Sequence, residues 1–224
     1  MRLGSRYRAL IAPRLGIVAT GPAVLDVGAG DGDLLRRMGA DVKVALDPVR
    51  VRQGGVRAVQ GDGTQAPFAA ASFDTVLALD VLEHVADDAA LVRELVRMVK
   101  PGGVVWVSVP AREHAVFPGF ITPWLHRRWG HLRPGYRLPD VLALFPDDAK
   151  VTTLAWNEPW FRALYVPLRA LAALAPPVAG AALTMIARLD GGAAPGDRGH
   201  YFLRVAMPGP GDHAVQASDS FDAS

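Results

Sequence analysis

The chain has 224 residues, of which 50% are hydrophobic and 21% are charged, and its formal net charge at pH 7 is +2. This size and composition predict one domain with an extension and a sizeable core, and the lack of a block of like charges argues against a nucleic-acid-binding arm. Without cysteine the chain forms no disulfide, thiolate-bound zinc site or thiol nucleophile.

The first 20 residues show a short amphipathic pattern that predicts a helix ending near Gly21 and Pro22. Basic residues interrupt every apolar run in this segment, so no signal peptide is expected. We therefore expect an intracellular, cytoplasmic protein without a transmembrane span.

From residue 23 onward, short apolar runs alternate with segments of helical periodicity. The runs predict strands at 23–28, 42–47, 56–62, 73–80 and 104–110, and the spacing predicts helices at 33–39 and 87–100. Such alternation is typical of an α/β fold with a doubly wound, mostly parallel sheet and helices on both faces. The almost continuous hydrophobicity of the strands fits a sheet that is covered on both sides.

The second half of the chain has a different character. Residues 111–140 are rich in aromatic, His and Arg side chains but show little periodicity, and a helix is predicted at 140–145. Strands are predicted at 150–156 and 200–208. Between them, residues 159–190 are rich in Ala and Leu, and Pro167, Pro176 and Pro177 are expected to interrupt this segment. The small, polar residues 209–224 predict a disordered tail.

A glycine-rich stretch, VLDVGAGDGDLL, occupies residues 24–35 between the first predicted strand and its helix. Such a loop directs backbone N–H groups at an anionic group of a ligand, and Gly28 and Gly30 allow close approach. A dinucleotide fingerprint would place its third glycine at position 33, which is Asp33 here, so a dehydrogenase is disfavoured. Asp26, two residues before the first glycine, suits a ligand that carries an ammonium group. Asp31 and Asp33 are expected to cap the following helix.

Further acidic residues follow the next three predicted strands. Asp47 ends the second strand, Asp62 lies between two glycines after the third, and Asp80 ends the fourth. Open α/β sheets bind ligands at this carboxyl edge. Asp47 suits ribose hydroxyls and Asp62 suits an exocyclic amine. Each residue alone is equally well explained as a turn former, and only their order in the chain favours a ligand site.

Five ordered motifs resemble those of the class I S-adenosylmethionine-dependent methyltransferases of the small-molecule type. The motifs cover about residues 20–110 and are VLDVGAGDGDLL, LDP, GDGTQAPFAAASFDTV, ALDVLEHV and LVRELVRMVKPGGVVWVSVP. The resemblance implies a Rossmann-like seven-stranded sheet with an antiparallel last strand. It also implies S-adenosylmethionine as cofactor and S-adenosylhomocysteine as product.

Carried over by position, the resemblance implies a role for each motif residue. Asp26 would hold the amino end of the cofactor, Asp47 the ribose and Asp62 the adenine amine, and Asp80 would lie near the methionyl group. The expected cofactor-binding residues are Asp26, Gly28, Ala29, Gly30, Asp47, Pro48, Asp62, Gly63 and Asp80.

Candidate catalytic residues come from the segments that follow the fourth and fifth strands. Histidine is the usual general base for a hydroxyl acceptor. The candidates are His84, His114, His131 and Tyr136. The resemblance favours His84 as a structural or cofactor-contacting residue over a base. No metal site is expected, because the histidines lack ligand spacing with acidic residues.

The stretch 126–137 is dense in polar groups and is expected to close over the acceptor pocket. Arg112, Arg133 and Arg137 could hold a carboxylate or phosphate of the substrate. The alternative is a surface loop whose arginines are solvated.

The apolar segment 165–187 is too interrupted to span a membrane. Ordinary core packing is the favoured interpretation, an apolar acceptor wall is the second, and peripheral contact with a membrane surface stays open. Nearby aromatic residues could line such a pocket, namely Trp124, Trp129, Trp156, Trp160 and Phe161.

The sequence therefore predicts a single methyltransferase domain over residues 1–208, with acceptor-side insertions at about 111–140 and 159–190. The predicted activity is methyl transfer to a small-molecule or lipid-like acceptor, with oxygen as the first choice of acceptor atom, in secondary or envelope metabolism. The alternative is a catalytically silent S-adenosylmethionine-binding protein that scaffolds another enzyme. A macromolecular substrate would require a basic face or a recognition domain, and neither is visible. The oligomeric state stays open.

Overall fold

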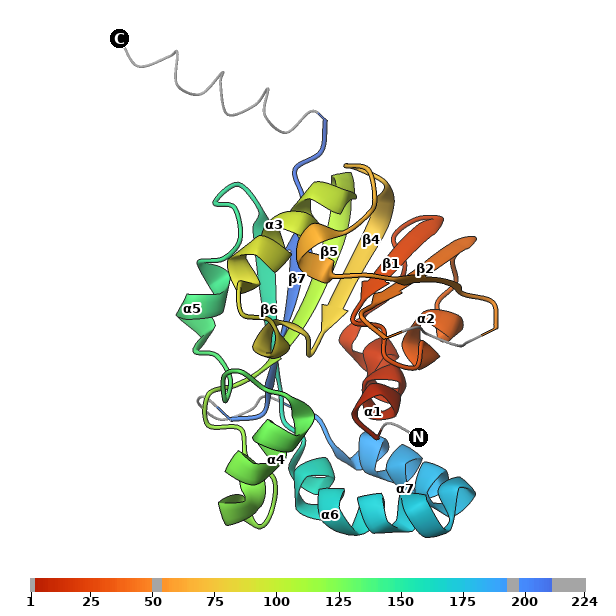
Figure 1. The fold of residues 1–224 in the computed structure, drawn as a ribbon, viewed down its shortest axis with the longest axis vertical. Coiled ribbons are helices and arrows are strands. Elements are labelled where there is room, and N and C mark those ends of the chain that lie inside the picture. The colour runs from red at the N-terminus through yellow and green to blue at the C-terminus, as the bar shows by residue number, and fades with distance from the viewer. Residues whose placement is uncertain (1–2, 50–53, 193–197, 211–224) are drawn as a thin grey trace.

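The computed structural model describes residues 3–49, 54–192 and 198–210, and its centre is a seven-stranded sheet (Figure 1). The strands lie in the order β3-β2-β1-β4-β5-β7-β6. Only β7 runs antiparallel to its neighbours, β5 and β6. The predicted Rossmann-like sheet with an antiparallel last strand is thereby confirmed. The strands are β1 (Ala23–Val27), β2 (Val42–Asp47), β3 (Arg57–Gln60), β4 (Phe73–Leu79), β5 (Val99–Pro110), β6 (Lys150–Trp156) and β7 (His200–Ala206).

Helices connect the strands and form a further layer beyond the carboxyl ends of the parallel strands, where α4, α6 and α7 lie (Figure 1). The α-helices are α1 (Leu3–Ile11), α2 (Asp33–Arg37), α3 (Asp88–Met98), α4 (Thr122–Trp129), α5 (Leu138–Leu142), α6 (Pro159–Leu174) and α7 (Pro176–Leu189). Short 3-10 turns are η1 (Ala12–Leu15), η2 (Gly63–Gln65), η3 (Leu82–His84) and η4 (Gly119–Ile121).

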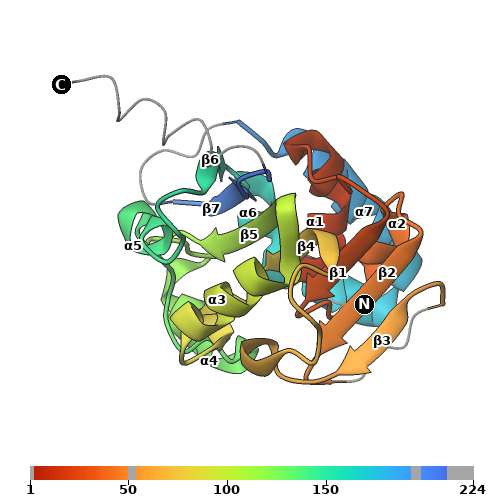
Figure 2. The same ribbon diagram turned by 90° about the horizontal axis from the view of Figure 1, so that it is seen from above.

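Two hydrophobic cores cover the two faces of the sheet, because successive side chains of a strand point to opposite sides. In β1, Val24 packs into the core with α1, α2, α6 and α7, whereas Leu25 packs into the core with α3. Figure 2, viewed from above Figure 1, shows α3 and α1 on opposite sides of the strands. Both faces of the central strands are therefore covered by hydrophobic side chains and shielded from water, as their continuous hydrophobicity predicts.

The helix predicted at 87–100 ends earlier, at Met98, and β5 begins at Val99. Pro101 disfavours a helical conformation in the residue before it, so Lys100 extends instead. Phe73 pairs with Val99 and Thr75 pairs with Val104, so the register shifts around the Gly102 turn. The early end of α3 lengthens the strand that leads to the functional edge.

Of the interruptions that the sequence predicts in residues 159–190, the one at Pro167 is absent and the one at Pro176 is present. The helix α6 continues through Pro167, because the loss of one backbone hydrogen bond is offset by burial of Phe161, Tyr165 and Leu168. Pro176, by contrast, begins α7 at a position where a helix needs no N–H donor. The helices α6 and α7 form a hairpin that occupies the predicted insertion at about 159–190.

Two segments differ from prediction or lie outside the described residues. The aperiodic region 111–140 contains the helix α4, and the helix expected at 140–145 begins earlier, at Leu138. The predicted disordered tail falls almost wholly on residues 211–224, which the structure does not describe. Within the described ranges, no helix combines the length and the apolar character needed to cross a membrane.

Candidate active site

A cavity of about 1220 Å³ opens at the carboxyl ends of β1, β2 and β4. At one end it is lined by the glycine-rich loop, by Asp26 and Asp47 near the ends of β1 and β2, and by Asp62 after β3. At the other end it reaches α1, α6 and the start of β7. This volume lies above the range of about 300–1,000 Å³ that is usual for small-ligand pockets.

The glycine-rich loop forms the floor of the cavity between β1 and α2. Gly28 has a φ of +72° and Gly30 a φ of +62°, a region that other residues rarely adopt. A Cβ atom on Gly28 would lie 2.5 Å from Val81 Cγ2. The residue that caps α2 is Gly32, without a side-chain hydrogen bond, so the prediction that Asp31 and Asp33 cap this helix is wrong. Asp33 instead pairs with Arg36 and Arg37 one turn later.

Asp47 links the loop to the end of β2. Its carboxylate accepts hydrogen bonds from the Gly30 N–H at 2.9 Å and the Val49 N–H at 2.8 Å. The side chain lines the cavity and is 7% exposed. Each carboxylate oxygen has a second lone pair, so Asp47 can hold the loop and still accept from a ligand.

Asp26 lies at the end of β1, buried in the cavity wall. Burial raises the pKa of its carboxyl to about 8, and the charges of Asp47 and Asp31 add to this effect. A carboxyl group with a raised pKa beside two carboxylates gains most from a positively charged ligand group nearby. The role of Asp26 in binding an ammonium group stays a prediction.

Asp62 and Gly63 border the cavity on the side of β3. The Asp62 carboxylate accepts a hydrogen bond from the Thr64 N–H at 2.8 Å and starts η2, and the residue is exposed. At Gly63 a Cβ atom would lie 2.8 Å from Val27 Cγ1, so the chain passes close to β1 here. Both positions reach the cavity, and Asp62 keeps one oxygen free for a ligand.

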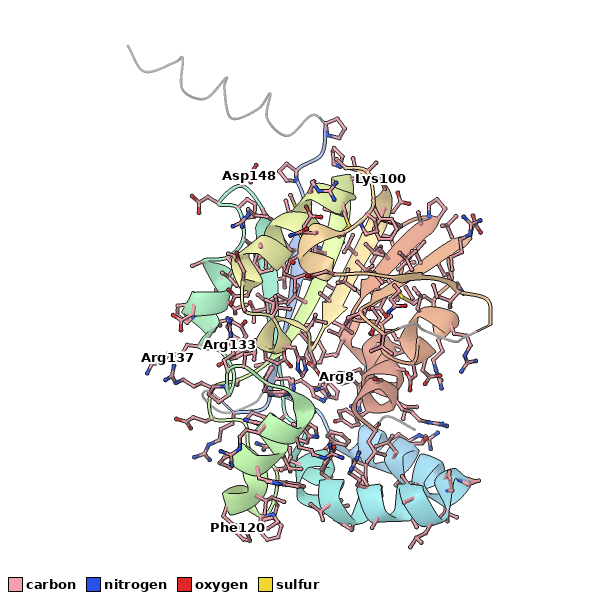
Figure 3. All side chains as sticks on the ribbon, viewed as in Figure 1. Arg8, Lys100, Phe120, Arg133, Arg137 and Asp148 are labelled. Carbon is pink, nitrogen blue, oxygen red and sulfur yellow. The ribbon has the colours of Figure 1, made fainter. Side chains whose placement is uncertain are left out.

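Asp80 is the centre of a buried ionic cluster that the sequence did not predict. Its carboxylate lies 2.6 Å from Arg8 Nη2 and accepts a hydrogen bond from Ser108 Oγ at 2.6 Å. Arg8 also contacts Glu158 at 3.3 Å and His200 Nε2 at 2.7 Å. Figure 3 shows Arg8 at the lower end of the sheet and Lys100 at the opposite end. The Arg8 charge is the strongest influence that holds the pKa of Asp80 well below its usual range, against the effect of burial.

The contacts of His200 define its tautomer. Arg8 can only donate, so His200 Nε2 accepts and Nδ1 carries the hydrogen. The distance from His200 Nδ1 to Glu158 Oε1 is 2.6 Å. His114 Nδ1 lies 3.7 Å from the same Glu158 oxygen. Burial favours a neutral Glu158, but the neighbouring His200 and Arg8 outweigh this effect and lower its pKa to about 2. Burial lowers the pKa of His114 to about 3, so its imidazole is neutral.

A second group of titratable side chains follows β4. Glu83 is 1% exposed, and burial next to Asp80 raises its pKa well above the usual range. His84 is exposed, and its Nδ1 lies 3.2 Å from the Gly130 carbonyl oxygen. The His84 and His131 rings meet edge to face at 4.7 Å. All three residues line the cavity.

Tyr136 does not line this cavity, whereas the other three candidate catalytic residues do. Arg133 does not line it either. The Tyr136 hydroxyl donates to Asp88 at 2.8 Å, and Arg133 pairs with Asp88 and donates to the carbonyl oxygens of Val85 and Ala86. The guanidinium of Arg133 therefore fastens the chain after α4 to the start of α3. Arg112 and Arg137 do not line the cavity either, and Arg137 points outward in Figure 3.

The far wall of the cavity is aromatic and comes from α4 and α6. It is lined by Trp129, Phe161 and Tyr165, and Arg169 lies at its border. Trp129 contacts Tyr165 edge to face at 5.2 Å, so the two helices meet here. Of the five aromatic residues suggested for a pocket, Trp124, Trp156 and Trp160 do not line it.

The sequence profile of a methyltransferase domain matches residues 2–149. The chain belongs to this family. A ubiquinone biosynthesis O-methyltransferase of Azorhizobium caulinodans is 37% identical over 132 residues, which are 49% of this chain and 52% of that protein. A methyltransferase of a Mycobacterium species (strain JLS) is 40% identical over 97 residues, 39% of this chain and 38% of that protein. The chain thus spans about half the length, or less, of these curated relatives.

Solved structures share the fold of this methyltransferase domain. An S-adenosylmethionine-dependent methyltransferase of Thermotoga maritima superposes with a TM-score of 0.64 at 15% identity, covering 90% of this chain and 89% of that one. A phosphoethanolamine N-methyltransferase of Haemonchus contortus, solved with S-adenosylmethionine, has a TM-score of 0.58 at 18% identity and covers 91% of this chain and 52% of that one. The fold is that of the class I S-adenosylmethionine-dependent methyltransferases, whose cofactor is S-adenosylmethionine.

Proposed function

We propose that this methyltransferase domain transfers the methyl group of S-adenosylmethionine to a hydroxyl group of a small, partly apolar acceptor. One observation carries the proposal: a single cavity joins the glycine-rich loop and its acidic residues to a second compartment with aromatic and histidine side chains. The first compartment suits the cofactor and the second suits an acceptor.

The residues of the first compartment fit S-adenosylmethionine by their chemistry. Asp26 would bind the ammonium group, and Asp47 would accept from the ribose hydroxyls with the lone pairs that the loop leaves free. Asp62 would accept from the adenine amine, with Gly63 giving the ring close access to the chain. Gly28, Ala29, Gly30 and Pro48 would contact the cofactor mainly through the backbone and by shape.

Asp80 needs a narrower role than the resemblance implied. Its carboxylate is already held by Arg8 and Ser108. We propose that it orients the wall between the two compartments and contacts the methionyl group at most with its remaining lone pairs. The cofactor supplies the methyl group as an electrophile, and the protein aligns the acceptor and excludes water.

The second compartment supports an acceptor with both an apolar part and a polar reacting group. Trp129, Phe161 and Tyr165 provide apolar contact area, and His84, His114 and His131 face the same space. Relatives 37% identical to part of this chain are named ubiquinone biosynthesis O-methyltransferases, which supports oxygen as the acceptor atom. Membrane contact stays a prediction, and the exposed apolar side chains on α4 and α6, such as Trp124 and Trp160, are compatible with it.

The test uses purified protein, methyl-labelled S-adenosylmethionine and an extract of the source cells, with the product partitioned between organic solvent, water and precipitated macromolecule. We expect label in the organic phase with the wild-type protein and none with the Asp47→Ala variant. Label only in the precipitate would contradict a small acceptor. Cofactor binding without label in any fraction, even with extracts from several growth conditions, would instead favour a silent scaffold protein.

A further inference from the structure

Two groups of three metal-ligating side chains meet in the described parts of this cavity. One consists of His114, Glu158 and His200, and the other of Glu83, His84 and His131. In each group, one ligand-type atom from each residue lies within 4.8 Å of the other two. Each group supplies two imidazoles and one carboxylate, a donor set that binds divalent transition metals in many proteins.

The first group already holds a cation. The Arg8 guanidinium contacts Glu158 at 3.3 Å and His200 Nε2 at 2.7 Å. Since that nitrogen accepts from Arg8, the other nitrogen of His200 carries a hydrogen and has no lone pair for a metal. Arg8 would have to leave before a metal ion could bind, and its withdrawal would leave Asp80 without its guanidinium partner.

The second group lacks such a cation. The two arginines whose charges act on Glu83 are Arg8 and Arg133. Arg8 is held by Asp80 and Glu158, and Arg133 is held by Asp88. Among the described residues, Glu83 Oε2 is buried without a hydrogen-bond partner. Burial of a polar oxygen without a partner is costly, and a cation bound between the three side chains would give this oxygen a partner.

The two histidines of the second group are prepared for the same ligand. His131 Nδ1 is buried and has no hydrogen-bond partner in the described part of the chain. His84 Nδ1 faces the Gly130 carbonyl oxygen, which can only accept, so His84 Nδ1 carries the hydrogen and Nε2 keeps its lone pair. A carbonyl contact of this kind orients most metal-binding histidines in proteins.

We propose that Glu83, His84 and His131 bind a divalent transition-metal ion of the Zn²⁺ class at the acceptor side of the cavity. Three protein ligands leave at least one coordination position open, and all three residues line the cavity, so the open position faces the acceptor. The sequence predicted no metal site, because His131 lies far from the Glu83–His84 pair in the chain. In the fold, the Leu132 N–H donates to the Glu83 carbonyl oxygen at 2.8 Å, and His84 Nδ1 contacts the Gly130 carbonyl oxygen, so the two segments lie side by side.

The role of this site in catalysis rests on the proposed function. A bound divalent cation lowers the pKa of a coordinated hydroxyl, whose proton is then released to solvent. The acceptor oxygen forms its bond to the methyl carbon as the carbon–sulfur bond breaks, and the electron pair of that bond stays on sulfur to give S-adenosylhomocysteine. No side chain needs to act as the general base in this scheme.

The test is titration of the chelator-treated full chain with Zn²⁺ by calorimetry and with Co²⁺ by visible absorption. We expect one metal site per chain. Its metal affinity should fall at least about tenfold in Glu83→Gln and in His84→Ala, because even residues that only hydrogen-bond to metal ligands contribute that much. His84 is exposed, so its replacement tests the site without disturbing the core. His114→Asn, in the first group, is the matched control and should bind metal like the wild type.

Absence of stoichiometric metal binding would overturn the metal site. Wild-type metal affinity in both the Glu83→Gln and His84→Ala variants would also overturn it, as would a loss of affinity found only in His114→Asn. Affinity for S-adenosylhomocysteine, measured without metal, separates this proposal from the proposed function. Cofactor binding without metal binding overturns only the metal site. Metal binding without methyl transfer to any acceptor overturns only the proposed function.

Discussion

Arg8 Nη2 lies 2.6 Å from Asp80 Oδ2, so a side chain of the first helix closes the end of β4. Both side chains are largely buried, and Arg8 also contacts Glu158 and His200. An ion pair thus joins the N-terminal helix to the end of β4, where Arg8 and Asp80 both line the cavity. The contact makes α1 part of the active-site wall as well as of the hydrophobic core.

We expect Arg8→Met to destabilise the protein by about 3–5 kcal/mol, because Asp80 and Glu158 lose their shared cation in a buried site. Urea unfolding measures the change. Arg36→Met is the matched control, since Arg36 pairs with Asp33 on the surface and such pairs contribute about 0–1 kcal/mol. Similar losses in the two variants would show that the Arg8 cluster is not a structural element.

Asp47→Asn should weaken S-adenosylmethionine binding by about 10- to 100-fold. Replacement by an amide removes the charge and half of the acceptor capacity, and hydrogen bonds to charged groups contribute about 1.5–3 kcal/mol. Calorimetry with the wild type and the variant measures the change. Asp140→Asn on α5, which is exposed and does not line the cavity, should bind with wild-type affinity. Unchanged affinity in Asp47→Asn would refute the ribose assignment.

Gly28→Ala should abolish cofactor binding or impair folding, because the residue has a φ of +72° and the new methyl group would meet Val81 Cγ2 at 2.5 Å. Gly16→Ala is the control, with a φ of +71° but no atom within 4 Å of the added Cβ. Both variants carry the same backbone strain of about 1 kcal/mol. The difference between their thermal unfolding temperatures and cofactor affinities therefore reports the close packing of the loop.

Asp26→Asn should stabilise the free protein, and the gain should grow as the pH rises. The pKa of Asp26 is raised from 3.8 to about 8 by burial and by Asp47, so between these values the folded state keeps a proton that the unfolded state releases. Stability of the wild type therefore falls with rising pH across this window, by at most about 1.4 kcal/mol per pH unit. Asn has no such dependence, so the two proteins should converge near pH 4.

Thermal unfolding of both proteins between pH 4 and pH 8 measures this difference. A constant offset across the range would show that Asp26 does not hold a proton in the folded state. The same variant should bind S-adenosylmethionine more weakly than the wild type at pH 8, since the neutral amide cannot pair with the ammonium group.

The order of the motifs in residues 20–110 was sufficient to predict the parallel part of the fold and the meeting of the glycine-rich loop with Asp47 and Asp62 at one cavity. The reason is local: each acidic residue directly follows an apolar strand, and parallel strands place their carboxyl ends at one edge. Asp47 and Gly28 therefore lie where the sequence placed them. Where backbone geometry competed with periodicity, as at Lys100 and Pro167, prediction of the element ends failed.

The acceptor side was decided by the tertiary structure. Arg8, Glu158 and His200 come from three distant segments, and nothing in the local pattern of any one indicates that they share a buried charge cluster. Tyr136 was a catalytic candidate from the sequence, but in the fold its hydroxyl donates a hydrogen bond to Asp88. The sequence by itself determined the sheet and which glycines and acidic residues lie at its carboxyl edge, because those signals lie in neighbouring residues. Only the fold determined which charges meet, because pairing energies depend on distance and burial across the whole chain.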